Sequence, residues 1–130
     1  MNLDNTLMAA LGMQVITLEK KLVEIKMPVD NRTRQPMGFL HGGASVALAE
    51  SAASMGAYIN ADAKTEQIFG IEINANHVKS KKTGWVTGRA VPLHIGKNTM
   101  VWEVKISDET EQLLSIARCT IGVVRKKAPE

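Results

Sequence analysis

The sequence predicts an α+β fold in which an antiparallel sheet curls around one long buried helix. Three observations support this prediction: one long stretch of small and apolar residues, several segments in which apolar and polar residues alternate, and turn-forming residues between those segments. The predicted order is a strand hairpin, the helix and then four strands joined by short turns. Short connections favour antiparallel pairing, because parallel strands need a long crossover between them.

The N-terminal part of the chain is predicted to contain a short helical turn and a hairpin. The turn lies within residues 5–10, and the two strands span residues 13–18 and 22–27. An ordered loop follows over residues 28–40, which contain two prolines and a glycine. The second strand has an apolar face that consists of Val23, Ile25 and Met27.

Residues 42–60 are predicted to form the long helix. Small and apolar residues occupy nearly every side of it, so the helix must be surrounded by protein. The stretch is about as long as a membrane span, but it contains Glu50 and three serines. A charge in the middle of a span costs too much for a membrane helix. We therefore expect a core helix.

Four strands are predicted after a polar break at residues 61–67. The second spans residues 85–91, the last spans residues 113–124, and residues 125–127 are expected to form a frayed tail. The first and third strands have apolar faces that consist of Phe69, Ile71, Ile73 and Ala75, and of Met100, Trp102, Val104 and Ile106.

Length and composition restrict the class of protein. The 130 residues predict a single domain over residues 1–130, large enough to fold without disulfides or metal. The lone cysteine, Cys119, cannot form an intrachain disulfide, and the three histidines lie far apart, so we expect no metal site. The first residues lack a signal-peptide pattern, which predicts a cytoplasmic protein. A net charge of +3 with only 4% aromatic residues disfavours nucleic-acid binding.

His41, Gly42 and Gly43 stand where the predicted loop becomes the helix. A helix start offers free backbone N–H groups and a partial positive charge, and glycine leaves them uncovered. The Gly42 N–H can therefore serve as an oxyanion donor for a substrate carbonyl. The alternative is that the glycines simply permit a tight turn.

Glu50 carries the central chemical hypothesis. It lies in the middle of an apolar helix that has no other charge, where an unpaired carboxylate would be costly to bury. We interpret it as a base or nucleophile aimed into a pocket; the alternative is a glutamate that reaches a solvated edge. Ser54, four residues on, shares its helix face and can support the carboxylate or a water molecule, whereas Ser51 is expected to be a packing residue.

The spacing of Gly42 and Glu50 predicts an assembly. Eight residues separate them, or about 12 Å along the helix axis, which is too far for both to meet one substrate carbonyl within one chain. Gly42 of one copy and Glu50 of another can meet one carbonyl if the helix of the second copy runs antiparallel to the first. We therefore expect a homodimer with two composite sites, and leave open whether dimers form a tetramer.

Several segments of the chain match the pattern of a known family: QPMGFLHGGAS (35–45), GIEINANH (70–77) and PLHIG (92–96), together with Glu50 and Ser54. They resemble the hotdog-fold thioesterases of the phenylacetate-degradation type, and within these the branch that acts on aryl-CoA thioesters such as 4-hydroxybenzoyl-CoA and 1,4-dihydroxy-2-naphthoyl-CoA. The resemblance implies a six-stranded antiparallel sheet wrapped around the helix.

The resemblance also implies roles for the site residues. Gln35 and His41 would orient the carbonyl and the water, the Gly42 N–H would polarise the carbonyl, and Glu50 would attack or activate the water that Ser54 supports. His41 as a helix cap and Gln35 as a loop hydrogen-bonding residue are the alternatives.

Weaker candidates for substrate binding lie on or near the strands, where they can meet the substrate or the phosphates of coenzyme A. For most of the charged ones a solvated face is the favoured interpretation. The histidine of the first C-terminal strand is equally compatible with a satisfied core position. They are Gly43, His77, Lys79, Ser80, Arg89 and His94.

These observations favour a hydrolase that splits acyl-CoA or aryl-CoA into free acid and CoA, without metal or redox cofactor, CoA being part of the substrate. There are three alternatives. Glu50 beside His41 argues against a non-catalytic acyl-CoA-binding protein, and the Asp/His motif of thioester hydration or dehydration is not seen. Hydrolysis on an acyl- or aryl-carrier protein remains open. The mild basic charge suits an acidic carrier. The residues do not define the acyl group.

Overall fold

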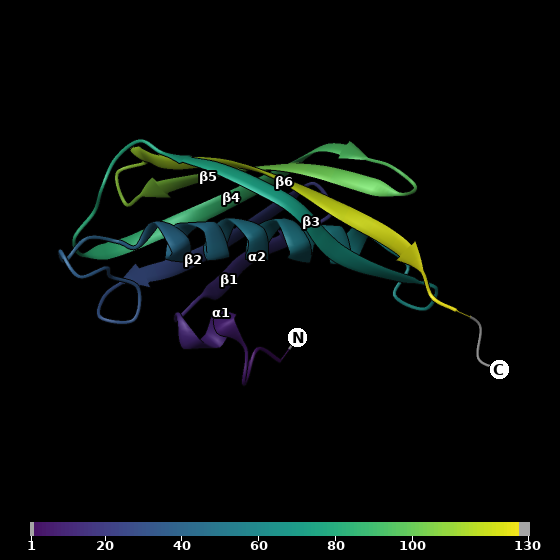
Figure 1. Cartoon of the computed structure of the whole chain (residues 1–130), viewed down its shortest axis with the longest axis horizontal. Helices are drawn as coiled ribbons and strands as arrows, with labels where there is room; N and C mark the ends of the chain where they lie inside the picture. Colours follow the sequence, from purple (N-terminus) through teal and green to yellow (C-terminus); the bar gives the residue numbers. More distant parts are fainter. Residues whose placement is uncertain (1, 128–130) are drawn as a thin grey trace.

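The computed structural model describes residues 2–127, so residues 1 and 128–130 of the predicted domain lie outside the described residues. Within that range the chain forms two helices and six strands (Figure 1). They are α1 (Leu7–Ala10), β1 (Gln14–Glu19), β2 (Leu22–Val29), α2 (Gly42–Asn60), β3 (Glu66–His77), β4 (Gly84–Ile95), β5 (Thr99–Asp108) and β6 (Leu113–Arg125).

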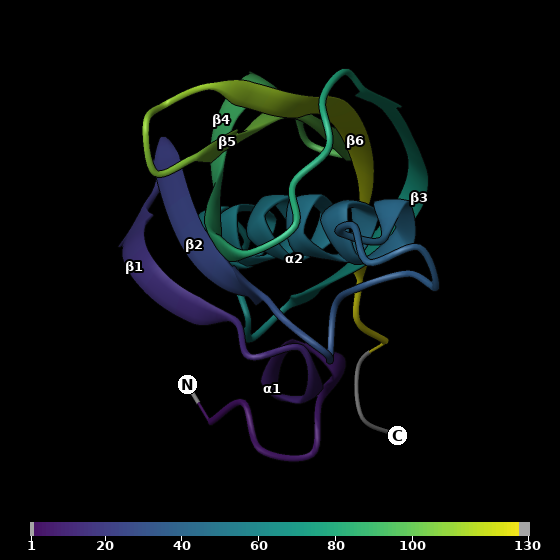
Figure 2. The same ribbon diagram turned by 90° about the vertical axis from the view of Figure 1, so that its left-hand side faces the viewer.

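The six strands form one antiparallel sheet in the order β1-β2-β4-β5-β6-β3, which curves around α2 (Figure 2). This is the hotdog fold, and it confirms the predicted α+β class. However, β3 and β4, which are consecutive in the chain, do not pair with each other. Because β4 pairs with β2, and β5 and β6 follow it, β3 is placed at the far edge against β6. The connection from β3 to β4 therefore crosses between the two halves of the sheet.

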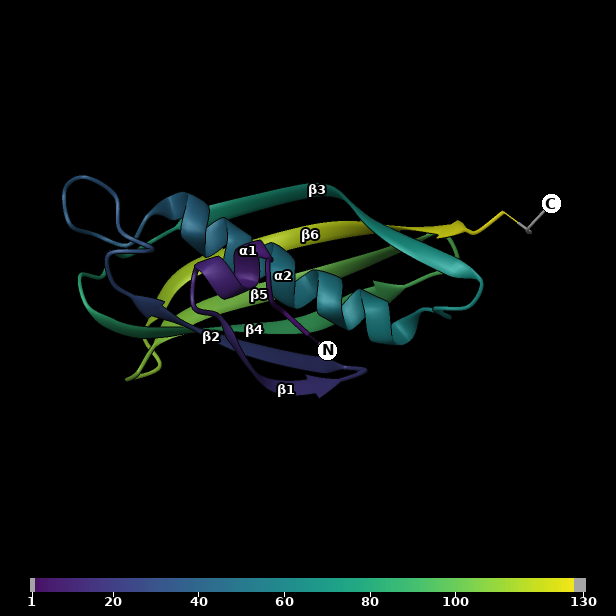
Figure 3. The same ribbon diagram turned by 90° about the horizontal axis from the view of Figure 1, so that it is seen from below.

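Small residues allow α2 to fit into the concave face of the sheet. Ala49, Ala52 and Ala53 are fully buried there, and the indole of Trp102 lies over Gly56. α1 lies on the side of α2 that is turned away from the sheet (Figure 3). The predicted apolar faces of β2 and β5 are confirmed as core, with Val23, Ile25, Met27, Met100, Trp102, Val104 and Ile106 buried.

The predicted apolar face of β3 is wrong in its first half. Phe69 and Ile71 are 55% and 62% exposed, whereas Ile73 and Ala75 pack against the core. The pairing of β3 with β6 shifts between Gly70 and Glu72, so one extra residue interrupts the alternation. Ile71 is the unpaired residue of this bulge, and a bulge moves the residues before it to the opposite face, so both Phe69 and Ile71 lie outside.

The predicted ends of two strands also need correction. β2 continues through Pro28 to Val29, opposite Trp85 and Gly84, where a loop was expected. The predicted frayed tail is wrong for Arg125 and Lys126. Arg125 pairs with Glu66 at the end of β6, and the Lys126 backbone N–H donates to the Thr65 carbonyl. No helix within residues 2–127 is long and apolar enough to cross a membrane.

Candidate functional site

His41 caps the N-terminus of α2. Its backbone is extended, and its Nδ1 accepts a hydrogen bond from the Gly43 N–H at 2.7 Å. The His41 N–H donates to the Thr33 carbonyl at 2.8 Å, which attaches the cap to the preceding loop. The structure thus gives His41 the capping role that the sequence left as an alternative, and leaves its Nε2 outside that bond.

The amide of Gly42 is left without a partner by this cap. Among residues 2–127 no hydrogen bond donated by the Gly42 N–H is found. The imidazole of His77 approaches so closely that a Cβ at position 42 would lie 3.0 Å from its Nε2. Glycine is therefore needed here for a close approach, and the amide stays available to an oxygen from outside the chain.

A cavity of about 360 Å³ lies beside Gly42. Gly42, His77, Lys79 and Ser80 all line it, so the structure brings these four predicted residues together. It also contains Ser45 and Ser115, which the sequence analysis did not single out. Ser115 lies deep in the core and binds the Nδ1 of His77 through its Oγ at 2.7 Å. Its only signal in the sequence was a serine within an apolar strand.

Glu50 is exposed in the single chain. The expectation that its apolar neighbours in sequence bury this carboxylate is therefore wrong for one copy of the chain. The reason is its position on the side of α2 that the sheet does not cover. Its carboxylate lies beside the backbone of Gly70 in β3, where an added Cβ would be 3.2 Å from Oε2. Burial raises the pKa of the nearby Cys119 thiol to about 12, and the carboxylates of Glu50 and Glu72 add to the effect.

A second cavity, of about 440 Å³ and open to solvent, is lined in part by Glu50. Ser54 lines it as predicted, but Ser51 does too, which corrects its assignment as a packing residue. The remaining walls are apolar or aromatic and were not predicted: they are Met8, Met55, Tyr58 and Ile68. Their positions depend on how α1 and β3 pack around α2, and periodicity does not reveal that.

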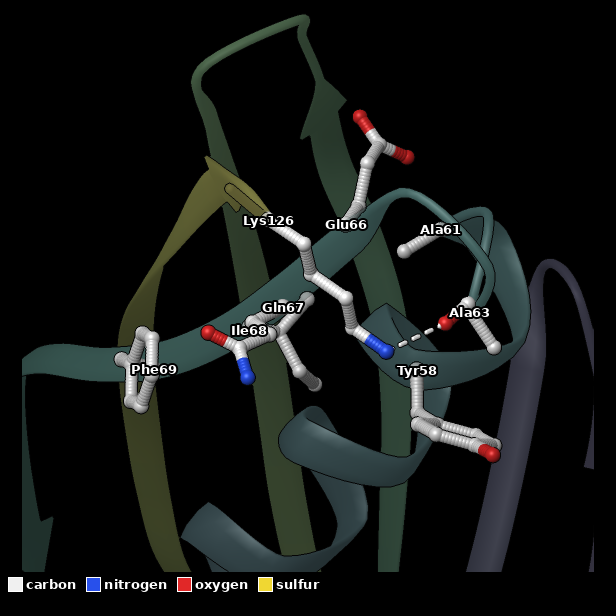
Figure 4. A pocket seen from close by; sticks show the side chains of 8 residues that line it. All are labelled: Tyr58, Ala61, Ala63, Glu66, Gln67, Ile68, Phe69 and Lys126. Carbon is white, nitrogen blue, oxygen red and sulfur yellow. Dashed lines mark hydrogen bonds between the residues drawn. The ribbon is translucent and has the colours of Figure 1, made fainter. Parts of the chain in front are cut away.

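The Glu50 cavity adjoins another at the end of α2, shown in Figure 4, because both are lined by Tyr58 and Ile68. This outer cavity measures about 300 Å³. The Nζ of Lys126 donates to the Ala63 carbonyl at 2.7 Å across its rim. Apolar space therefore extends from the carboxylate along the C-terminal half of α2.

Gly42 and Glu50 line different cavities of the chain. The two groups predicted to act on one carbonyl are thus not brought together within one copy. This agrees with their separation of two helical turns.

Several predicted residues lie elsewhere. Gln35 acts in its loop, where its Oε1 accepts from the Met37 N–H and its backbone bonds Phe39 and Gly38. His41 and Gly43 line a separate cavity on the α1 side of the helix. No group of three metal-binding side chains occurs within residues 2–127.

Two further candidates lie on β4. Arg89 alternates with the buried Gly88 and Ala90, points outward and lies 3.8 Å from Glu24. Its solvated-face interpretation therefore fits the structure. His94 is exposed near the end of the strand and lines none of the cavities described above.

Comparison with known proteins gives a consistent result. A family model described as the thioesterase superfamily matches residues 37–115. A 1,4-dihydroxy-2-naphthoyl-CoA hydrolase from Listeria monocytogenes is 50% identical over 121 residues, which cover 93% of this chain and 98% of that protein. The protein of the same name from Escherichia coli is 46% identical over 102 residues, covering 78% of this chain and 74% of that protein. The crystal structure of a mutant thioesterase from Pseudomonas aeruginosa matches with a TM-score of 0.93 and 39% identity, over 95% of this chain and 89% of that one.

Proposed function

Because this chain belongs to the thioesterase superfamily and is a thioester hydrolase, we propose that it cleaves acyl-CoA or aryl-CoA to the free acid and CoA. The relatives named as 1,4-dihydroxy-2-naphthoyl-CoA hydrolases support an aryl-CoA substrate. The cavity next to Glu50 supports it as well, because its walls are mainly apolar and aromatic and suit an acyl group. CoA enters as part of the substrate.

The observation that carries the proposal is that one helix holds both an unpartnered amide and a carboxylate. The Gly42 N–H at the start of α2 is a donor for a developing oxyanion. Glu50, further along α2, is an acceptor that can take a proton from water or attack a carbonyl. These are the two groups that thioester hydrolysis requires.

We propose that two copies of the chain complete each site, with Gly42 from one copy facing Glu50 of the other. β3 lies at the edge of the sheet next to Glu50, and its apolar residues Phe69 and Ile71 are exposed. An edge strand presents backbone groups that can pair with another chain. A second copy docked along β3 would also cover the open side of the Glu50 cavity and remove the carboxylate from solvent.

The reaction balances with these groups alone. As a base, Glu50 takes one proton from water while the water oxygen bonds to the thioester carbonyl carbon. The carbonyl oxygen becomes an oxyanion at the Gly42 N–H. When that oxyanion collapses, the C–S bond breaks, and the CoA thiolate takes the proton held by Glu50. As a nucleophile, Glu50 would instead bond to the carbonyl carbon and form a mixed anhydride as the C–S bond breaks and CoA leaves as its thiolate. Water would then hydrolyse the anhydride to the free acid and a protonated Glu50, which passes its proton to the thiolate.

Release of free thiol from benzoyl-, dihydroxynaphthoyl-, phenylacetyl- and medium-chain acyl-CoA tests the proposal. We expect turnover of at least one aryl-CoA, and a loss of at least about 1,000-fold in kcat for Glu50→Gln. Glu19→Gln is the matched control, since this exposed glutamate ends β1 at the opposite edge of the sheet from β3 and lines none of the cavities described above; it should retain activity. Undiminished hydrolysis by Glu50→Gln would show that the catalytic group is wrong.

A carrier-protein thioester is the second candidate, and the net charge of +3 favours it because carrier proteins are acidic. Turnover of an acyl- or aryl-loaded carrier together with no turnover of any CoA ester would select it over the CoA substrate.

A further inference from the structure

We propose that His77 supplies a second hydrogen-bond donor to the thioester carbonyl oxygen, and that Ser115 positions His77 and fixes the nitrogen that carries its proton. The inference rests on the proposed function, because it assigns new roles at the same carbonyl site.

His77 and Ser115 are cross-strand partners. They face each other in register where the last residue of β3 meets β6. The His77 Nδ1 lies 2.7 Å from the Ser115 Oγ, and Ser115 is only 2% exposed. A ring held at one nitrogen by a buried hydroxyl on a neighbouring strand has its orientation set by the sheet.

The burial of Ser115 decides the direction of this hydrogen bond. A hydroxyl carries one proton, and a buried one that finds no acceptor costs free energy. Among residues 2–127, the His77 ring is the hydrogen-bond partner found for the Ser115 side chain. The Ser115 O–H therefore donates to Nδ1, and the proton of the neutral imidazole resides on Nε2.

The Nε2 atom is directed at the start of α2. Of the ring atoms, it lies nearest to the position a Cβ of Gly42 would occupy, at 3.0 Å. Both residues line the same cavity. On this proposal, a carbonyl oxygen that enters the cavity beside Gly42 accepts hydrogen bonds from both the Nε2–H and the Gly42 N–H. Two donors at one point are the arrangement that stabilises a carbonyl oxygen as it gains negative charge.

This arrangement explains why position 42 lacks a side chain. Even a methyl group there would press against Nε2 and separate the two donors. It also gives a function to Ser115, whose polar group would otherwise be an unfavourable choice for a core strand position between Leu114 and Ala117.

Paired substitutions at His77 test its role as a donor. Gln can place an N–H near the position of Nε2, whereas Phe keeps the ring shape without any donor. We expect His77→Phe to lower kcat by roughly 100-fold with little change in KM, and His77→Gln to restore part of that loss. The proposal would be overturned if His77→Phe changed only KM. It would also be overturned if His77→Phe and His77→Gln both had the kcat of the unmodified chain.

Paired substitutions at Ser115 test positioning. Ser115→Ala should lower kcat by about tenfold, and Ser115→Thr, which keeps the hydroxyl, should recover most of it. The ¹⁵N chemical shifts of the His77 ring provide a readout that does not depend on activity. They should show the proton on Nε2 in the unmodified chain and in Ser115→Thr, and a mixture of tautomers in Ser115→Ala. A proton on Nδ1 in the unmodified chain would overturn the assignment.

The outcomes also separate this inference from the proposed function. If Glu50→Gln abolishes hydrolysis while His77→Phe retains it, the second donor is wrong and the CoA thioesterase proposal stands. If the unmodified chain cleaves no CoA ester, the proposed substrate is wrong, and the ¹⁵N shifts still decide the tautomer.

Discussion

The indole of Trp102 fills the space next to Gly56 that a side chain at position 56 would occupy. Trp102 is fully buried, and atoms of its six-membered ring are the nearest to the position that a Cβ of Gly56 would occupy. This contact lets β5 approach α2 closely and sets the depth at which the helix sits in the sheet. The position of the helix in turn determines where Gly42 and Glu50 lie.

Gly56→Ala should destabilise the protein. Alanine is favoured over glycine within a helix by about 1 kcal/mol, but a buried, rigid indole cannot move aside. We expect a net loss of about 2 kcal/mol in the free energy of unfolding, measured by urea denaturation. Gly122→Ala is the control, because the nearest atom there belongs to Ile71, which is largely exposed and can rotate away. Equal losses in the two variants would contradict the role assigned to Trp102.

The cap formed by His41 can be separated from any chemical role of its ring. His41→Ala removes the acceptor for the Gly43 N–H and should cost about 1 kcal/mol of stability. His41→Asn should recover that stability, because asparagine is a strong N-cap residue. Thermal unfolding of both variants measures the cap, and kcat of His41→Asn measures the ring. If both variants lose the same stability, the capping interpretation is wrong.

The Cys119 thiol should weaken the fold at alkaline pH. Burial raises the pKa of this thiol from 9.0 to about 12, so above pH 9 the unfolded chain releases a proton that the folded chain keeps. Stability therefore falls as pH rises from about 9 towards 12, by at most about 1.4 kcal/mol per pH unit for one group. Cys119→Ala should show a shallower decline between pH 9 and 10.5 in urea titrations. Parallel curves for the two proteins would contradict this.

Local patterns predicted most of the fold. Helix α2 has its predicted bounds, because the loop with its prolines ends at His41 and the polar break begins at Ala61. The alternation in β5 identified Trp102 and the other inward residues of this strand as core, since each inward residue is followed by an outward one.

The features that sequence patterns missed depend on contacts between distant segments. The bulge beside Gly70 is visible only once β3 is aligned with β6, so Phe69 and Ile71 were placed on the wrong face. Likewise, the pairing of His77 with Ser115 joins residues 38 apart in the chain. The exposure of Glu50 follows from how much of α2 the sheet leaves open, and apolar neighbours in sequence suggested the opposite.

The central claim is that each catalytic site combines Gly42 of one copy with Glu50 of another. Two variants that should each be inactive can test it: Glu50→Gln, and Gly42→Val, whose side chain would cover the amide and displace His77. The two proteins are unfolded together in equal amounts, refolded and assayed for thiol release. In a mixed dimer one site keeps both Gly42 and Glu50, so random pairing should restore about a quarter of the unmodified activity. No recovery, with mixed dimers shown to form by mass spectrometry, would contradict the shared site.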